Sequence, residues 1–192
     1  MDEIAPGCVI LLNGPSSAGK STLARAVQDR IDVPFLRLSL DLLLFGGEVL
    51  PARRDRDGPF AWASLRPRLF VGYYGCLSAL AAAGSNIVTD LIIETEWQRG
   101  RLTHQLARFD VFYVGLHCPL PELERRERMR GDRRIGDARR DLTFVHSFGA
   151  YDVEVDTSRP LDENADRIIA AWRTRSSPGR FHGWSRPGGG HP

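Results

Sequence analysis

Lysine is almost missing from this sequence of 192 residues, because all but one of its 26 basic residues are arginine and the exception is Lys20. Cysteine is scarce too. The three cysteines, Cys8, Cys76 and Cys118, lie far apart and form no CxxC pair, so neither a metal site nor a disulfide framework is expected. Two of them fall within apolar runs, which favours buried free thiols.

The sequence also lacks a strong excess of either charge and any long hydrophobic run. Its 26 basic and 24 acidic residues give a net charge of +2 and are spread along the chain, so no nucleic-acid partner is expected. No apolar stretch approaches the length that crosses a membrane, and the acidic start MDEIAPG has no signal-peptide pattern. We therefore expect a cytoplasmic protein without a membrane partner, whose oligomeric state the sequence leaves open.

Strands and helices are predicted to alternate along most of the chain. Apolar runs predict strands at residues 8–13, 35–40, 86–93, 111–117 and 153–155. Helical spacing predicts helices at 22–31, 67–83, 97–109, from 119, around 142–147 and at 161–172, with an irregular insertion at 46–66. This alternation predicts a three-layer α/β/α fold with a mainly parallel five-stranded sheet. We expect one domain at residues 1–173 and a disordered tail at 174–192, which is poor in core-forming residues.

The segment from Gly14 to Ser21, GPSSAGKS, matches the phosphate-loop pattern GxxxxGK[ST] between a buried strand and an amphipathic helix. Glycines at both ends let the backbone wrap a phosphate, and the helix N-terminus adds its positive end. Lys20 can then reach the β- and γ-phosphates of ATP. A plain glycine-rich turn is the alternative, which the position of the lone lysine disfavours. The predicted nucleotide-binding residues are Gly14, Ser16, Ser17, Ala18, Gly19, Lys20, Ser21 and Thr22.

Two side chains are predicted to hold Mg²⁺ beside the nucleotide. The Ser21 hydroxyl is the usual ligand from a phosphate loop, and Asp90 closes the apolar run of the third predicted strand. An ordinary aspartate at a strand end is the alternative for Asp90. Glu94 is a weaker candidate for the same role.

Asp41 ends the second predicted strand, which we expect beside the first strand, with its carboxyl end facing a ligand crevice. A carboxylate there could accept the proton of an acceptor hydroxyl during phosphoryl transfer. It could equally be the N-cap of a short helix at residues 42–45.

An arginine cluster further along predicts a lid. Arg130, Arg133 and Arg134 lie around Gly131 and ahead of Gly136. Guanidinium groups that close over a γ-phosphate would stabilise its charge and exclude water. The alternative is a solvated basic helix end. The predicted catalytic residues are Asp41, Lys20, Arg133 and Arg130.

Several segments together resemble the chloramphenicol phosphotransferase family, from roughly Val9 to Trp172. They are ILLNGPSSAGKS, Asp41, RGDR at Arg130–Arg133 followed by Gly136 and Ala138, Val145-His146, and the run from Tyr151 to Thr157. The resemblance implies a single-domain kinase fold that transfers the γ-phosphoryl group of ATP to the primary hydroxyl of chloramphenicol, which inactivates this antibiotic. It also implies a general base at Asp41 and lid arginines at Arg130 and Arg133.

The acceptor half departs from the family pattern. The family has a paired Asp-Asp where this chain has Asp90-Leu91, and the stretch from Phe45 to Arg66 does not match. Arginines occur in and after that stretch, at Arg53, Arg54, Arg56, Arg66 and Arg68. They would suit an anionic metabolite as acceptor, whereas chloramphenicol is neutral. A nucleotide-dependent switch without any acceptor is a third hypothesis, which needs no base at Asp41.

Overall fold

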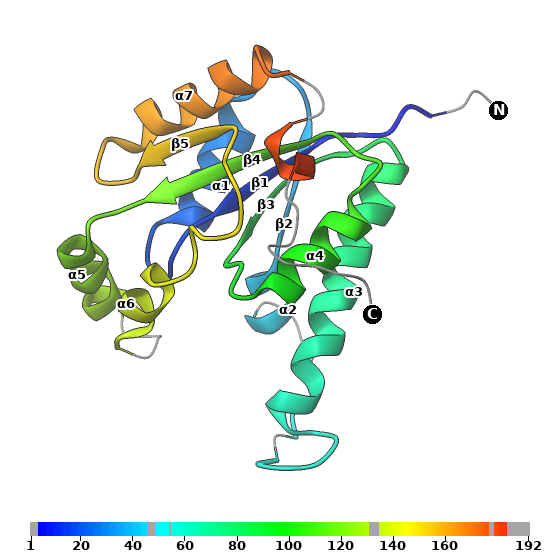
Figure 1. Ribbon diagram of the computed structural model, residues 1–192, viewed down its shortest axis with the longest axis vertical. Coiled ribbons are helices and arrows are strands. Elements are labelled where there is room, and N and C mark those ends of the chain that lie inside the picture. The colour runs from blue at the N-terminus through cyan, green and yellow to red at the C-terminus, as the bar shows by residue number, and fades with distance from the viewer. Residues whose placement is uncertain (1–3, 46–48, 54, 131–134, 177–178, 184–192) are drawn as a thin grey trace.

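A parallel sheet of five strands forms the middle layer of the protein (Figure 1). This computed structural model describes residues 4–45, 49–53, 55–130, 135–176 and 179–183. The strands are β1 (Val9–Asn13), β2 (Phe35–Ser39), β3 (Asn86–Leu91), β4 (Val111–His117) and β5 (Val153–Asp156), in the order β2-β3-β1-β4-β5. Every neighbouring pair is parallel, which confirms the predicted fold class.

Helices cover both faces of this sheet. They are α1 (Lys20–Arg30), α2 (Leu40–Phe45), α3 (Trp62–Ala82), α4 (Glu96–Gln105), α5 (Leu120–Arg130), α6 (Asp137–Leu142) and α7 (Leu161–Arg173). Successive residues of β1 point to opposite faces. Ile10 and Leu12 pack in one core with α1 and α7, whereas Val9 and Leu11 pack in a second core with α3 and α4. In the described part of the chain, no helix has the length and apolar character needed to span a bilayer.

The strand order corrects one expectation and places the site. Asp41 does not follow a neighbour of β1, because β2 pairs with β3 and β1 lies between β3 and β4. Asp90 on β3 lies opposite Ser39 of β2 on one side and Leu12 of β1 on the other. Since all the strands are parallel, their carboxyl ends meet at one edge, where ligands of such sheets bind.

Several helices differ from their predicted bounds, and α4 ends at Gln105 rather than residue 109. α3 begins at Trp62 rather than Pro67, so this proline lies inside the helix and cannot donate to the carbonyl of Ala63. Ala63 is exposed, and water can bond its carbonyl instead. α6 begins directly after Gly136, whose left-handed φ of 101° turns the chain, and it ends at Leu142, where a helix was predicted to begin.

Part of the predicted disordered tail is structured. Arg180–Gly183 form a 3-10 helix in which Phe181 is fully buried. The Arg99 guanidinium lies 3.8 Å above the Phe181 ring, and its Nη2 donates to the Phe181 carbonyl at 2.6 Å. The Asp152 carboxylate accepts from the backbone N–H groups of Tyr113 and Arg180, both at 2.7 Å. A single aromatic residue therefore anchors a segment whose composition predicted disorder; the domain boundary at residue 173 stays a prediction.

Replacing Phe181 by alanine is expected to lower the free energy of unfolding by about 3–5 kcal/mol, because it empties a fully buried site. Urea denaturation followed by circular dichroism measures this change. Phe45→Ala is the matched control, because the Phe45 side chain is 76% exposed, and its effect should stay below about 1 kcal/mol. Equal effects of the two substitutions would contradict the packing of Phe181.

Candidate active site

The loop from Gly14 to Gly19 joins β1 to α1 in a conformation that suits an anion. Gly14 runs so close to β4 that a Cβ atom there would lie 2.8 Å from the Leu116 carbonyl oxygen. Ser17 and Gly19 have left-handed backbones, with φ of 62° and 82°. Left-handed residues in such a loop turn successive N–H groups toward one side and create an anion-binding concavity. The predicted nucleotide-binding residues thus form one continuous loop and helix start, while their contacts with a nucleotide stay a prediction.

Lys20 is the first residue of α1, and its Nζ donates to the Pro15 carbonyl oxygen at 2.7 Å. The ammonium group is therefore folded back over the loop, on the side of the cavity that the loop lines. A charge at this place adds to the positive end of the α1 dipole.

Ser21 and Asp90, the predicted Mg²⁺ ligands, lie in contact. The Ser21 hydroxyl donates to Asp90 Oδ2 at 2.7 Å. Asp90 is 6% exposed, and among the described residues its Oδ1 atom has no hydrogen-bond partner. A buried carboxylate oxygen without a donor suits a cation. Among the described residues, no group of three or more His, Cys, Asp or Glu side chains could hold a metal ion. A bound Mg²⁺ would therefore take its other ligands from phosphate and water oxygens.

Asp41 lies in the first turn of α2, which begins at Leu40. Ser39 makes the capping hydrogen bond at the start of this helix, since its Oγ accepts from the Asp41 backbone N–H at 3.3 Å. The N-cap alternative for Asp41 is therefore wrong. Its side chain instead lines the same cavity as the phosphate loop.

That cavity has a volume of about 590 Å³, which is in the range of small-molecule sites. One side is formed by residues of the phosphate loop and α1, from Ser16 to Thr22. The apolar residues that line the cavity are Leu40, Leu44, Trp62, Phe70, Leu91 and Ile92. The carboxylates of Asp41, Asp90 and Glu94 line the same cavity.

Arginines on α5 and α6 also face this cavity. Arg130 lines it, while its predicted role in a lid stays a prediction; Arg133 and Arg134 lie outside the described residues. Arg126 was missed, although its i,i+4 spacing from Arg130 places the two on one face of α5. Arg126 Nη2 donates to the Thr157 carbonyl at 2.7 Å. With Thr157 and Gly19 it lines a second, smaller hollow of about 340 Å³ beside the loop.

The arginines of the acceptor stretch are paired or face solvent. Arg66 Nη2 donates to Glu94 Oε2 at 2.7 Å, and its guanidinium lies 4.6 Å above the Phe70 ring. Arg53 pairs with Asp55 at 2.7 Å and lies over an aromatic ring as well. Arg56 and Arg68 are exposed, and Arg54 lies outside the described residues. Of the described members of this cluster, Arg66 alone lines the cavity.

His146 lies outside the cavity, in a small polar cluster. Its Nδ1 shares a hydrogen bond of 2.8 Å with the Tyr151 hydroxyl, which also accepts from Asn13 Nδ2 at 2.8 Å. The ring stacks on His117, with 4.1 Å between centroids. Burial, with a smaller contribution from His117, lowers the pKa of His146 to about 4. His146 is thus a neutral packing residue at neutral pH.

Comparisons with known proteins show one family and related kinases. The family model described as "Chloramphenicol phosphotransferase-like protein" matches residues 7–173. "Putative O-phosphotransferase Rv2636" of Mycobacterium tuberculosis is 32% identical over 204 residues, which cover 95% of this chain and 89% of that protein.

Two solved structures share the fold. The APS kinase CysC of Mycobacterium tuberculosis has a TM-score of 0.66 and 21% identity, and the match covers 88% of this chain and 99% of that one. A sugar kinase from Janibacter has a TM-score of 0.65 and 18% identity, with 90% and 97% of the two chains covered.

Acidification is expected to destabilise the protein through His146. The folded chain protonates this ring near pH 4, whereas the unfolded chain does so near its ordinary value of 6.5. The unfolded state therefore binds the proton more readily, so this stabilisation is complete above about pH 6.5 and falls by roughly 2 kcal/mol on going to about pH 4.5. Urea denaturation at both pH values should show a smaller loss for His146→Gln than for the wild type. His104→Gln changes an exposed histidine and should match the wild type; a wild-type-like loss for His146→Gln would contradict the assignment.

Proposed function

The chain belongs to the chloramphenicol phosphotransferase-like family, and from this premise we propose that this phosphotransferase uses ATP as its donor and a hydroxyl group of a small neutral molecule as its acceptor. The observation that carries the proposal is the single cavity that contains both the phosphate loop with Lys20 and the carboxylate of Asp41. A nucleotide-dependent switch has no need for such a carboxylate. A cytoplasmic location, where ATP is available, and a role in antibiotic inactivation belong to the same proposal.

The two hollows beside the loop support a position for ATP. Both are lined by Gly19, Thr22 and Arg126, so one extended ligand can occupy them together. The adenine base of ATP lies in the smaller hollow beside Thr157, and the γ-phosphate lies in the larger cavity with Lys20. Mg²⁺ held by Ser21 and Asp90 would neutralise charge on the β- and γ-phosphates.

In the proposed reaction the acceptor oxygen attacks the γ-phosphorus while the bond from that phosphorus to the β,γ-bridging oxygen breaks. ADP leaves, and the proton of the acceptor hydroxyl passes to the Asp41 carboxylate. Lys20 and Arg130 bind phosphate oxygens as negative charge shifts toward the leaving group. The role of Arg133 stays a prediction from the sequence.

The lining of the cavity favours a neutral acceptor. Six apolar residues line the cavity, as described above. Arg66 also lines the cavity, where its guanidinium pairs with Glu94 and lies over the ring of Phe70. An anionic acceptor would have to break this pair, whereas a neutral molecule with an apolar part needs no such change. Chloramphenicol, the compound in the family's name, is neutral and is the first acceptor to test.

We expect the protein to transfer labelled phosphate from γ-labelled ATP to chloramphenicol or to another neutral hydroxyl compound. The panel should contain matched neutral and anionic members, and the Lys20→Ala variant serves as the control without the loop cation. Label should appear on a neutral acceptor with the wild type only. Label on anionic members alone would contradict the neutral acceptor, and hydrolysis without any transfer would favour a switch protein.

Asp41→Asn is expected to lower kcat by about 10²–10⁴-fold, because an amide cannot take the acceptor proton. Its affinity for the ATP analogue AMPPNP should change less than about twofold, since the nucleotide contacts lie on the loop. Asp29→Asn, an exposed carboxylate on α1, is the matched control and should keep wild-type rates. A normal rate in Asp41→Asn would show that another group accepts the proton.

A further inference from the structure

A buried carboxylate joins α6 to the phosphate loop. Asp141 is fully buried, and its Oδ2 accepts from the backbone N–H of Ser16 at 2.9 Å. Its Oδ1 accepts from Arg140 Nη2 at 2.8 Å and from Arg140 Nε at 3.2 Å. One carboxylate therefore connects the backbone of the loop to the guanidinium of the preceding residue. Ser16 belongs to the phosphate-loop motif, whereas the sequence analysis singled out neither Asp141 nor Arg140.

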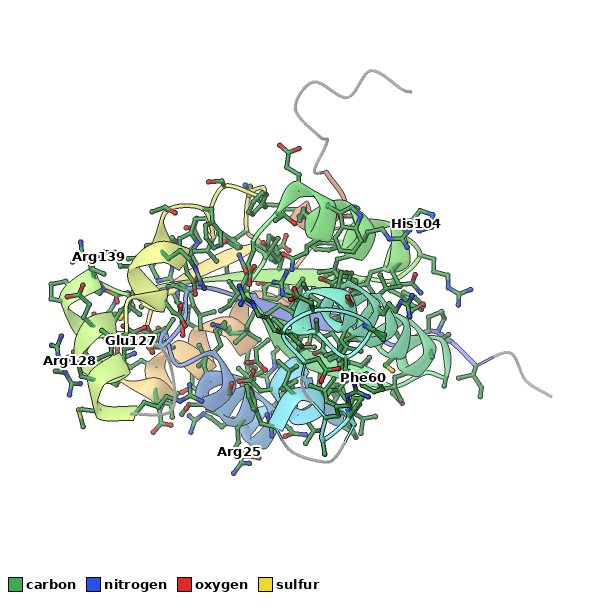
Figure 2. The ribbon with its side chains drawn as sticks, turned by 90° about the horizontal axis from the view of Figure 1, so that it is seen from below. Arg25, Phe60, His104, Glu127, Arg128 and Arg139 are labelled. Atoms are coloured by element: carbon green, nitrogen blue, oxygen red, sulfur yellow. The ribbon has the colours of Figure 1, made fainter. Side chains whose placement is uncertain are left out.

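A second buried carboxylate fixes the helix that carries this pair. Glu127 on α5 is 1% exposed, and it accepts from the backbone N–H groups of Gly136 at 2.8 Å and Ala138 at 3.0 Å. Figure 2 shows Glu127 between the ribbons of α5 and α6. The start of α6 is thus held on α5 and its end on the phosphate loop. Arg140 therefore lies on a helix whose start is held by α5 and whose end is held by the phosphate loop.

The position of Arg140 indicates which part of a nucleotide it faces. Arg140 lines the larger cavity together with Lys20, Asp41 and Glu94. It does not line the smaller hollow that is assigned to the adenine base. Its pKa is raised, first by the hydrogen bond with Asp141 and in smaller part by the fields of Asp137 and Glu94. The side chain is 60% exposed, and its Nη1 pairs with Asp137 Oδ1 at 3.0 Å. A guanidinium has five N–H donors, so donors beyond those that face Asp141 and Asp137 remain for a ligand.

We propose that Arg140 binds the γ-phosphate of the donor, and that Asp141 is the positioning residue that aims it from the phosphate loop. The inference rests on the proposed function, because it requires a nucleoside triphosphate in the cavity. It adds a cation from α6 to Lys20 and Arg130, which face the cavity from α1 and α5.

Electrostatics explain why the pair occurs as a unit. A buried carboxylate next to a phosphate loop would repel a triphosphate if it carried its full charge. Arg140 compensates that charge, and a hydrogen-bonded guanidinium is held in one orientation, which lowers the entropy lost on binding phosphate. The carboxylate can thus shape the loop through Ser16 without weakening the binding of an anion.

Isothermal titration calorimetry with AMPPNP and with ADP, both with Mg²⁺, tests the proposal without any acceptor. Arg140→Ala should weaken AMPPNP binding by about 10- to 100-fold, because a charge-assisted hydrogen bond is lost, and should change ADP binding by less than about twofold. Arg139→Ala is the matched control. Its side chain is 65% exposed and pairs with Glu124 on α5 at 2.6 Å, at the α5–α6 end of the molecule in Figure 2, and it is not among the residues that line the cavity, so both affinities should stay at wild-type values.

Asp141→Asn separates positioning from loop structure. The amide oxygen still accepts from Ser16, whereas the charge that orients Arg140 is gone, so AMPPNP should bind several-fold more weakly while ADP binding and the unfolding midpoint stay near wild type. Equal weakening of both nucleotides, or of neither, by Arg140→Ala would overturn the role of Arg140. Loss of both nucleotides in Asp141→Asn would show a purely structural role for Asp141. A wild-type protein that binds neither nucleotide would contradict the proposed function itself as well as this inference.

Discussion

The side-chain amide of Asn13 holds together the edge of the sheet at which the candidate site lies. Asn13 is the last residue of β1 and is fully buried. Its Nδ2 donates to the Val145 carbonyl and the Tyr151 hydroxyl, both at 2.8 Å, and its Oδ1 accepts from the Ile93 N–H at 3.0 Å. These bonds fix the segments after β3 and before β5 relative to β1. Because the phosphate loop begins at the next residue, its starting point depends on them, and a buried amide that lost a partner would remain unsatisfied.

Charge around the cavity is balanced locally rather than by a broad field. Arg66 faces Glu94, and Arg140 faces Asp141, each pair at hydrogen-bond distance. The net charge of +2 over 192 residues agrees with this pattern. In the proposed reaction an anionic donor would therefore meet a few fixed charged groups at the loop, and a neutral acceptor would meet the apolar residues of the same cavity.

The parts of the molecule that the sequence predicted are those encoded by contiguous residues. The phosphate loop is a local pattern, and apolar runs indicated β3, which carries Asp90, and β2, which ends two residues before Asp41. The bond of Asp141 to Ser16 spans 125 residues, and the packing of Phe181 under Arg99 spans 82, so no local pattern could indicate either. The neighbours of β2 depend on strand order, which strand prediction does not give. The start of α3 was predicted wrongly at Pro67, because proline is common in the first turn of a helix. Proline can also lie further inside a helix where water reaches the carbonyl that it leaves without a donor.

The lone lysine has a practical consequence for chemical labelling. Since every other basic side chain is arginine, histidine aside, amine-directed reagents find a single side-chain target in the whole chain. That target lines the cavity and stands at the start of α1. Acylation of the ammonium would remove its charge and place a bulky group at the mouth of the loop. Apart from the terminal amine, stoichiometric modification of this protein by such reagents is therefore a direct report on the accessibility of one residue in one cavity.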